Sequence, residues 1–415
     1  MLNCRFCNNK LKDIVINLGL QPSANRLLSK EEVLRIKLGD LESLGHLTVY
    51  LCNNCSLVQL GESEIPEKLF TKNYLYHSSF SQAWLNHAKK FVEWSIKNFN
   101  LTKDSKVLEI GSNDGYLLQH YVLKNITCLG IDPAGMVAKI AMKKNVETVV
   151  DFFTKKSAKE IVKKYGKQDL LIGNNVFAHI PNIRETIQSL KFCMSDNAVI
   201  SLEVPHLKNL VKEVLFDTIY DEHYFYFSLI ALQKIFKEFD LKIFKVEETL
   251  FHGGSIRIFI CDEYNDNYLV DKSVEQMIKK EKNINLDKIS GYVDLKTKVE
   301  KIRYNAKNFL KKEKAIGHKI GAYGAPAKGN VFLNFCDIKV DEIEFVVDET
   351  PVKQGLFLPG SHIPVFPPEK LKQFKPDVIA ILPWNFREEI LYKLNKINNW
   401  GAKIVTFIPN LKVLE

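Results

Sequence analysis

Apolar, strand-like runs alternate with helical stretches twice along this chain of 415 residues, and this alternation constrains the fold more than any other feature. In the first stretch the runs are KVLEIG, CLGID, TVV, LLIGNN and AVISLEV, followed by KIFKVEETL and SIRIFIC. In the second stretch they are GHKIGAYG, EIEFVVDE, DVIAILP and AKIVTFIP. Buried runs separated by helices are typical of parallel sheets covered by helices. The sequence therefore predicts two Rossmann-like α/β domains in one chain.

Three domains are predicted: a small β-rich unit over residues 1–67, the first α/β domain over 68–294 and the second over 295–415. Short β-type runs such as DIVINL, HLTVYLC and SLVQL give the first unit its β character. A Lys-rich stretch over residues 295–318 predicts a connecting helix whose charges form a solvated face.

The composition is that of a soluble globular protein, with 46% hydrophobic and 26% charged residues. The longest apolar runs are shorter than the roughly 18–20 residues of a membrane helix. No apolar segment followed by small residues stands at the N-terminus, which predicts a cytoplasmic protein with reduced cysteines. The net charge of +9 favours an anionic ligand, but Lys is dispersed and no Arg-rich arm occurs. We therefore expect a monomer that binds a nucleotide-linked small molecule and has neither a nucleic-acid nor a membrane partner.

Four of the eight cysteines form two CxxC pairs, Cys4 with Cys7 and Cys52 with Cys55. Four thiolates on two such turns predict a closed tetrahedral zinc site with no position open for water, which makes the zinc structural. A redox pair is the alternative. Zinc would stabilise a unit whose own core is too small to hold it together.

The segment VLEIGSNDGY is a buried strand carrying Glu109, followed by a turn that contains Gly111, Asn113 and Gly115. Such a turn brings the backbone close to a ligand at the carboxyl edge of a sheet. The next strand, CLGID, ends in Asp132, at the distance of roughly 20 residues where an acid can accept both hydroxyls of a ribose. The loop lacks the GxGxxG spacing that a pyrophosphate requires. This combination favours S-adenosylmethionine over NAD as the ligand, with a plain strand–helix turn as the remaining alternative.

Two further segments extend the predicted donor site. Asp151 and Phe152 follow the run TVV, where they would lie beside adenine. Asn174 lies at the end of the strand predicted from LLIGNN, at the point of the sheet edge where methyl transfer would occur.

The segment YDEHYFY crowds Tyr220, Glu222 and His223 between apolar runs. A general base near pH 7 is most simply a histidine that a carboxylate or a phenol orients. His179, in NNVFAHIPN, supplies a second imidazole at the same sheet edge. A single histidine is more often a core residue, but two in loops beside a methyl-donor site indicate a function.

The second α/β domain opens with GAYGAPAKGN, in which small residues including Gly324 precede Lys328 and Asn330. Small residues let the backbone approach phosphate oxygens, and the helix N-terminus and Lys328 supply positive potential. The segment HGGSIR adds a glycine pair and Arg257 for the same anion. Either segment could also be a turn that only requires positive φ. Together they predict a diphosphate bound between the domains.

Taken in order, these segments resemble the three-domain S-adenosylmethionine-dependent C-methyltransferases that act on nucleotide-linked keto-deoxysugars in antibiotic and surface-polysaccharide pathways. The resemblance spans essentially the whole chain, and it rests on the two CxxC pairs, GLQPSAN, YLYHSS, VLEIGSNDGYLL, NNVFAHIPN, YDEHYFYFS, HGGSIR and GAYGAPAKGN. It implies a small zinc-binding β-rich domain, a central Rossmann-like class I methyltransferase domain and a C-terminal Rossmann-like α/β domain that contributes to nucleotide-sugar binding. Asp132 stands where Glu is also common in this family, which leaves ribose binding intact.

The implied reaction is methyl transfer to a carbon next to a sugar ketone. The residues that would surround that carbon are Tyr220, Glu222, His223, His179 and one tyrosine of the pair Tyr74 and Tyr76, with Tyr76 preferred. Such a carbon becomes nucleophilic only when its proton leaves and the enolate oxygen is stabilised. His223 as the base, with a Tyr, a Glu or the second His near the carbonyl, supplies both requirements.

Two other functions stay open at this point. One is an RNA methyltransferase whose zinc module grips nucleic acid. The other is a nucleotide-sugar-binding protein without catalysis. The two imidazoles favour an enzyme over a binding protein, because a binding protein needs no base at the donor edge.

Overall fold

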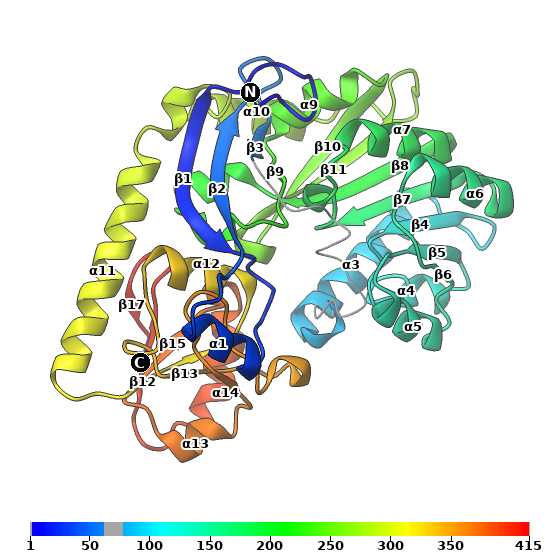
Figure 1. Ribbon diagram of the computed structural model, residues 1–415. Coiled ribbons are helices and arrows are strands. Elements are labelled where there is room, and N and C mark those ends of the chain that lie inside the picture. Colours follow the sequence, from blue (N-terminus) through cyan, green and yellow to red (C-terminus); the bar gives the residue numbers. More distant parts are fainter. Residues whose placement is uncertain (1, 62–77, 415) are drawn as a thin grey trace.

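The computed structural model describes residues 2–61 and 78–414, which form three sheets with helices around them (Figure 1). Among these residues, no helix combines the length and the apolar composition that crossing a bilayer requires. The predicted fold class, a β-rich N-terminal unit followed by two α/β domains, is confirmed.

The N-terminal sheet is antiparallel and contains a strand from the middle of the chain. In spatial order its strands are β1 (Asp13–Pro22), β2 (Leu44–Leu51), β3 (Val58–Leu60) and β9 (Phe225–Tyr226). Helix α1 (Lys30–Lys37) lies between β1 and β2 in sequence and begins with a capping box in which the side chains of Ser29 and Glu32 each bind the other's backbone N–H. The β-rich unit therefore depends on a segment that lies far beyond residue 67.

The central sheet has the strand order β10-β11-β8-β7-β4-β5-β6. Its strands are β4 (Lys106–Ile110), β5 (Thr127–Ile131), β6 (Thr148–Val149), β7 (Gln168–Asn174), β8 (Met194–Pro205), β10 (Leu241–Thr249) and β11 (Ser255–Asp262). Its helices are α3 (Gln82–Asn98), α4 (Gln119–Val122), α5 (Gly135–Lys143), α6 (Lys155–Tyr165), α7 (Ile183–Cys193), α8 (Leu207–Lys212), α9 (Leu229–Lys237) and α10 (Lys272–Lys282). Strand β11 runs opposite to the other six strands of this sheet and is antiparallel to both β10 and β8. Strand order reverses between β4 and β7, and ligands of such sheets bind at this reversal, beyond the carboxyl ends of the strands.

The C-terminal sheet repeats this arrangement with the order β14-β13-β12-β15-β16-β17. Its strands are β12 (Ile320–Tyr323), β13 (Phe345–Val347), β14 (Val365–Phe366), β15 (Val378–Ile381), β16 (Lys403–Thr406) and β17 (Lys412–Val413). Its helices are α11 (Leu295–Ala315), α12 (Ala327–Phe335), α13 (Lys370–Phe374) and α14 (Arg387–Asn395). The predicted connecting helix is α11, which buries an apolar stripe from Leu295 to Leu310. The four strands predicted from sequence are β12, β13, β15 and β16.

The N-terminal unit contacts both α/β domains. Its cysteine turns pack into the core of the central domain, where Phe6 faces Phe239. The segment around α1 lies on the C-terminal domain (Figure 1), where Leu28 forms a β-bridge with Phe357 and the carboxylate of Glu42 accepts the backbone N–H of Gly360. This unit thus joins the two α/β domains around one cavity.

Candidate active site and zinc centre

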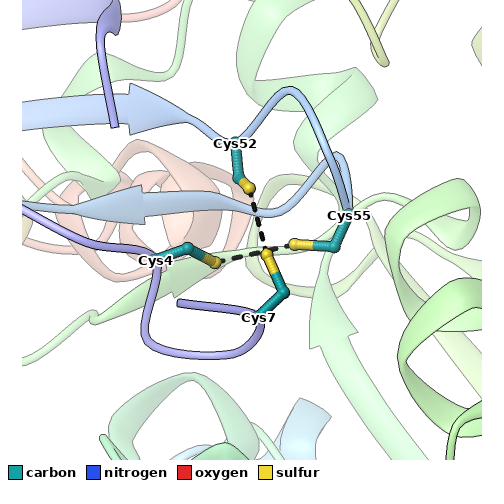
Figure 2. Close-up of side chains that lie close together, drawn as sticks. All are labelled: Cys4, Cys7, Cys52 and Cys55. Atoms are coloured by element: carbon teal, nitrogen blue, oxygen red, sulfur yellow. Dashed lines mark hydrogen bonds between the residues drawn. The ribbon is translucent and has the colours of Figure 1, made fainter. Parts of the chain in front are cut away.

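The four predicted metal ligands converge between two turns of the N-terminal unit (Figure 2). The Sγ atoms of Cys4 and Cys55 lie 3.6 Å apart, those of Cys7 and Cys52 lie 3.4 Å apart, and all four lie within 4.8 Å of one another. The turns match each other: Asn8 and Ser56 follow the second cysteine of each pair with positive φ.

These sulfur positions fit zinc. Tetrahedral coordination with Zn–S bonds of about 2.3 Å separates sulfurs by roughly 3.8 Å, close to the observed spacing. Gln59 Nε2 donates to Cys4 Sγ at 3.1 Å, which supports a thiolate there. Four sulfur ligands leave no open position, so the metal is structural.

The donor loop follows β4 and is held to the end of β5. Gly111 has a φ of +65°, and a Cβ at this position would lie 2.7 Å from Val176 Cγ2. Glycine is therefore required where the donor loop passes Val176, two residues after the end of β7. The Asp132 carboxylate lines the cavity beside this loop and accepts the backbone N–H of Asn113 at 2.9 Å and that of Ala134 at 2.8 Å. Burial raises its pKa, which these two hydrogen bonds oppose.

The residues around this loop fit S-adenosylmethionine. The carboxylate of Asp132 keeps lone pairs for ribose hydroxyls, and Asn174 lies at the cavity wall where β7 ends. Both polar atoms of the neighbouring Asn175 side chain are buried with no hydrogen-bond partner among the described residues, so they are open to a ligand. Phe152 also lines the cavity.

Three residues predicted to bind the donor lie away from the cavity wall. Glu109 is fully buried beneath the loop, where burial raises its pKa well above the ordinary value. Gly115 packs against Ala141 of α5. Asp151 is exposed and its carboxylate accepts the N–H of the next residue. None of these three residues is among those that line the cavity.

A contact that the sequence did not reveal fixes the donor loop from the other side. The side chain of Asn113 accepts the N–H of Ser78, and that of Asp114 accepts the N–H of Ser79. Lys144 Nζ donates to Ser79 Oγ at 2.8 Å. The predicted catalytic tyrosine, Tyr76, lies outside the described residues.

The predicted catalytic side chains gather on one wall of the cavity. The ring of His223 lies 4.0 Å from that of Tyr220 and 4.7 Å from that of His179, centroid to centroid. His223 Nδ1 lies 2.8 Å from the carbonyl oxygen of Thr218. Because a carbonyl only accepts, Nδ1 carries the proton and Nε2 of the neutral ring is the acceptor.

Burial shifts the titration of the two groups beside His223. It lowers the pKa of His179 to about 4, against a hydrogen bond with the backbone of Glu222. It raises the pKa of Glu222 to about 8, assisted by the negative charge of Asp221. At neutral pH, His179 is uncharged and most of Glu222 is protonated.

The N-terminal unit holds these carboxyl groups in place. Asn25 Nδ2 donates to Glu222 Oε1 at 2.7 Å, and Ser23 Oγ donates to Asp221 Oδ2 at 2.5 Å. The backbone N–H of Ala24 donates to Asp221 Oδ1 at 3.1 Å. Sequence reasoning assigned none of these residues a role, although GLQPSAN was the signal that contained them.

The C-terminal domain forms the opposite wall. Gly324 has a φ of +87°, and its missing Cβ would lie 2.5 Å from Pro383 Cδ. Lys328 lines the cavity, and its Nζ donates to Asn385 Oδ1 at 3.2 Å. Burial lowers the pKa of Lys328, which the nearby carboxylate of Asp217 opposes.

Two residues predicted to bind the substrate instead contact other parts of the protein. Arg257, on β11, forms a buried ion pair with Glu203, and its guanidinium carbon lies 4.0 Å from the ring centroid of Phe91. The alternation of side chains along β11 turns it toward α3 instead of the C-terminal domain. Asn330 is buried and donates to the carbonyl oxygen of Ala24, so it joins two domains. The structure therefore pairs Arg257 with Glu203 and Asn330 with Ala24, and neither residue lines the cavity where the diphosphate was predicted.

All three parts of the chain meet at one cavity of about 1710 Å³. Its walls carry the donor loop, the imidazole pair, the segment around α1 and the loop after β12. The fold and this site define a class I methyltransferase with a zinc-binding module.

Comparisons with known proteins agree with this assignment and narrow the class further. Residues 4–70 match a family model described as a zinc binding domain, 84–246 one described as a methyltransferase domain, and 250–409 one described as a C-methyltransferase C-terminal domain. C-methyltransferase NovU of Streptomyces niveus is 32% identical over 412 residues, which cover 99% of this chain and 96% of the relative. The chain therefore belongs to this C-methyltransferase family, and it is an S-adenosylmethionine-dependent C-methyltransferase with a zinc site of four cysteines.

Solved structures similar to this chain include two methyltransferases. A SAM-dependent methyltransferase from Anabaena variabilis aligns with a TM-score of 0.36 and 14% identity, over 43% of this chain and 86% of that one. Magnesium protoporphyrin IX methyltransferase from Synechocystis PCC 6803 aligns with a TM-score of 0.33 and 14% identity, over 42% of this chain and 78% of that one.

We expect Asp132→Ala to weaken S-adenosylmethionine binding at least about tenfold, because hydrogen bonds to a carboxylate contribute about 1.5–3 kcal/mol each. Calorimetric titration measures this directly. Asp151→Ala is the matched control, since Asp151 is exposed and does not line the cavity. This variant should bind S-adenosylmethionine with the affinity of the wild type. Equal affinities for all three proteins would remove Asp132 from the donor site.

Proposed function

We propose that this enzyme methylates a nucleotide-diphosphate-linked keto-deoxysugar at the carbon next to the ketone, as a cytoplasmic monomer. The observation that carries the proposal is the acceptor nitrogen of His223 on the same cavity wall as the donor loop. The size of the cavity supports a large second ligand, because pockets for one small molecule measure about 300–1,000 Å³. Lys328 adds positive charge suited to a diphosphate on the opposite wall.

His223 is the proposed base. Its Nδ1–H bond to the carbonyl of Thr218 fixes the tautomer, so Nε2 receives the proton that leaves the substrate carbon. The low pKa of His179, about 4, makes that ring a weaker base and supports a role near the carbonyl as a neutral group.

Glu222 and Tyr220 are the proposed hydrogen-bond donors to the enolate oxygen. Glu222 keeps its proton at neutral pH, while Asn25 occupies its other oxygen. A protonated carboxyl beside the developing negative charge stabilises it. S-adenosylmethionine, when bound, supplies the electrophilic methyl group, and the protein's remaining task is to position the carbon.

The direct test uses the purified protein with S-adenosylmethionine and several keto-deoxysugar nucleotides. Mass spectrometry should show a gain of one methylene on the sugar of at least one of them. Methylated RNA, with all the sugars unchanged, would instead favour the RNA methyltransferase alternative. Gel filtration should give the mass of one chain.

We expect kcat to fall as pH rises through about 8, because the raised pKa of Glu222 keeps its proton below that pH and loses it above. Glu222→Gln keeps a donor that cannot titrate, so this descending limb should move to higher pH while kcat near pH 7 falls by less than about tenfold. The pH profile of Glu213→Gln, an exposed residue, should match the wild type. If the descending limb of the pH profile is identical in all three proteins, a group other than Glu222 causes it.

A further inference from the structure

The C-terminal domain contacts the central domain beside the proposed catalytic wall through the side chain of Trp384. This residue opens the 3₁₀ turn Trp384–Phe386, three positions after the end of β15. Its indole Nε1–H donates to Oδ2 of Asp217 at 2.6 Å, and both side chains are buried. The proposed mechanism uses neither residue.

Glycine makes room for the indole ring on the central domain. Gly253, in the segment HGGSIR, has a φ of +87°, and a Cβ there would overlap Cη2 of Trp384. Lys328 of the C-terminal domain places its Nζ 5.2 Å from the centroid of the same ring. Both domains therefore fix the position of the indole, and seating this ring accounts for the first glycine of the predicted anion-binding pair.

Asp217 belongs to the turn that orients the proposed base. It is the middle residue of the 3₁₀ turn Phe216–Thr218, and the carbonyl of Thr218 accepts the Nδ1–H of His223. The backbone N–H and the hydroxyl of Thr218 both donate to the carbonyl of Leu215, which holds the turn from one side. The hydrogen bond from the indole holds it from the other side.

The carboxylate of Asp217 is suited to this role because it is enclosed and charged. Burial raises the pKa of Asp217 to about 6, which the positive charge of Lys328 and the indole N–H of Trp384 oppose. At neutral pH the group is therefore mostly ionised, and a hydrogen bond to a carboxylate is stronger than one between neutral groups. Removing the indole N–H would release the carboxylate and loosen the turn that carries it.

We infer that Trp384 and Asp217 are positioning residues for His223, because the hydrogen bond between them holds the turn whose carbonyl keeps this ring in its Nδ1–H tautomer. The tautomer of a neutral imidazole is set by the hydrogen bond that one of its nitrogens makes. The inference rests on the proposed function for the role of His223 as the base. What it adds is that the C-terminal domain determines, through the backbone of the central domain, which nitrogen of the base is free.

The tautomer is measured without any substrate, by ¹⁵N NMR of the full-length protein labelled at histidine. The signals missing from the spectrum of His223→Ala identify this ring. At about pH 8.5, above the ordinary histidine pKa of about 6.5, the wild type should show a protonated Nδ1 and an unprotonated Nε2. In Trp384→Phe, which keeps an aromatic ring without the N–H, the two signals should move toward each other as the tautomers mix.

Trp400→Phe is the matched control. The indole Nε1–H of Trp400 donates to the carbonyl oxygen of Pro376 at 2.8 Å, within the C-terminal domain. This variant also loses one indole hydrogen bond, but it should leave the signals of His223 unchanged.

Kinetics with the sugar nucleotide that proves to be a substrate separate positioning from a general loss of structure. Trp384→Phe and Asp217→Ala should lower kcat by about 10- to 100-fold, the effect of displacing a reacting group by about 1 Å. KM and the affinity for S-adenosylmethionine should stay within about threefold of the wild type. Asp217→Asn keeps an oxygen for the indole N–H, so its kcat should also stay within about threefold.

An unchanged tautomer in Trp384→Phe, or a kcat for Asp217→Asn as low as that of Asp217→Ala, would overturn the inference. If Asp217→Ala does not fold, the tautomer in Trp384→Phe decides the question by itself. Failure of the proposed function has a different signature, namely no methyl transfer to any nucleotide sugar while the tautomer of His223 still responds to Trp384→Phe.

Discussion

Replacing His223 by Ala should lower kcat by about 10²–10⁴, the contribution that a positioned general base usually makes. The side chain packs against the rings of Tyr220 and His179, and its Nδ1 donates to the carbonyl of Thr218, whereas Asp132 is held by the backbone of Asn113 and Ala134. Binding of S-adenosylmethionine should therefore stay within about twofold of the wild type. Single-turnover kinetics and calorimetry on the same preparation separate the two effects.

Exchange of solvent deuterium into the substrate identifies the base more directly. With S-adenosylhomocysteine in place of the donor, enolisation proceeds without methylation, and the wild type should exchange the proton next to the ketone. His223→Ala should not exchange it. His179→Ala is the matched control, because this second ring lies 4.7 Å from the first and should chiefly affect the carbonyl side. Exchange in His223→Ala together with none in His179→Ala would reverse the two assignments.

The parts of the site that could be predicted lie on single short segments. The donor loop could be predicted for two reasons. The turn at Gly111 requires glycine, and the acid Asp132 ends the strand that follows. The cysteine turns are readable for the same reason, since each CxxC pair encloses one turn. The two α/β domains followed from the alternation of buried runs.

The parts that could not be predicted depend on contacts between distant segments. Nothing in the local pattern around Asn25 indicates that its amide binds Glu222, which lies in another domain. Arg257 looked like an anion ligand beside two glycines, but its partner Glu203 comes from the neighbouring strand. Side-chain pairing across domains requires the tertiary structure.

The zinc centre is connected to the catalytic wall through the N-terminal sheet. Cys52 and Cys55 stand on the turn between β2 and β3, and the N–H of Cys52 donates to the carbonyl of Leu57 at 2.9 Å. Strand β3 pairs with β9, whose first residue follows His223 by two positions. Strand β1, which pairs with β2, ends just before the residues that hold Asp221 and Glu222. Zinc bound by the four cysteines would thus fix the position of the proposed catalytic groups through the N-terminal sheet.

Cys52→Ser should therefore reduce zinc from one per chain to well below one and lower kcat/KM by at least about 10², because structural zinc contributes roughly 10–16 kcal/mol to the folding of small zinc modules. Metal analysis and kinetics on the purified protein measure both quantities.

Cys128→Ser, which alters a partly exposed thiol on β5 outside the cluster, should keep both the zinc and the activity. S-adenosylmethionine binding by Cys52→Ser should survive better than turnover, since the donor loop belongs to the central sheet, whereas Asn25 and Ser23 bind Glu222 and Asp221. A Cys52→Ser protein that keeps its zinc would rule out the four-cysteine site. One that loses zinc and still turns over at the wild-type rate would show that the N-terminal sheet does not position Glu222 and His223.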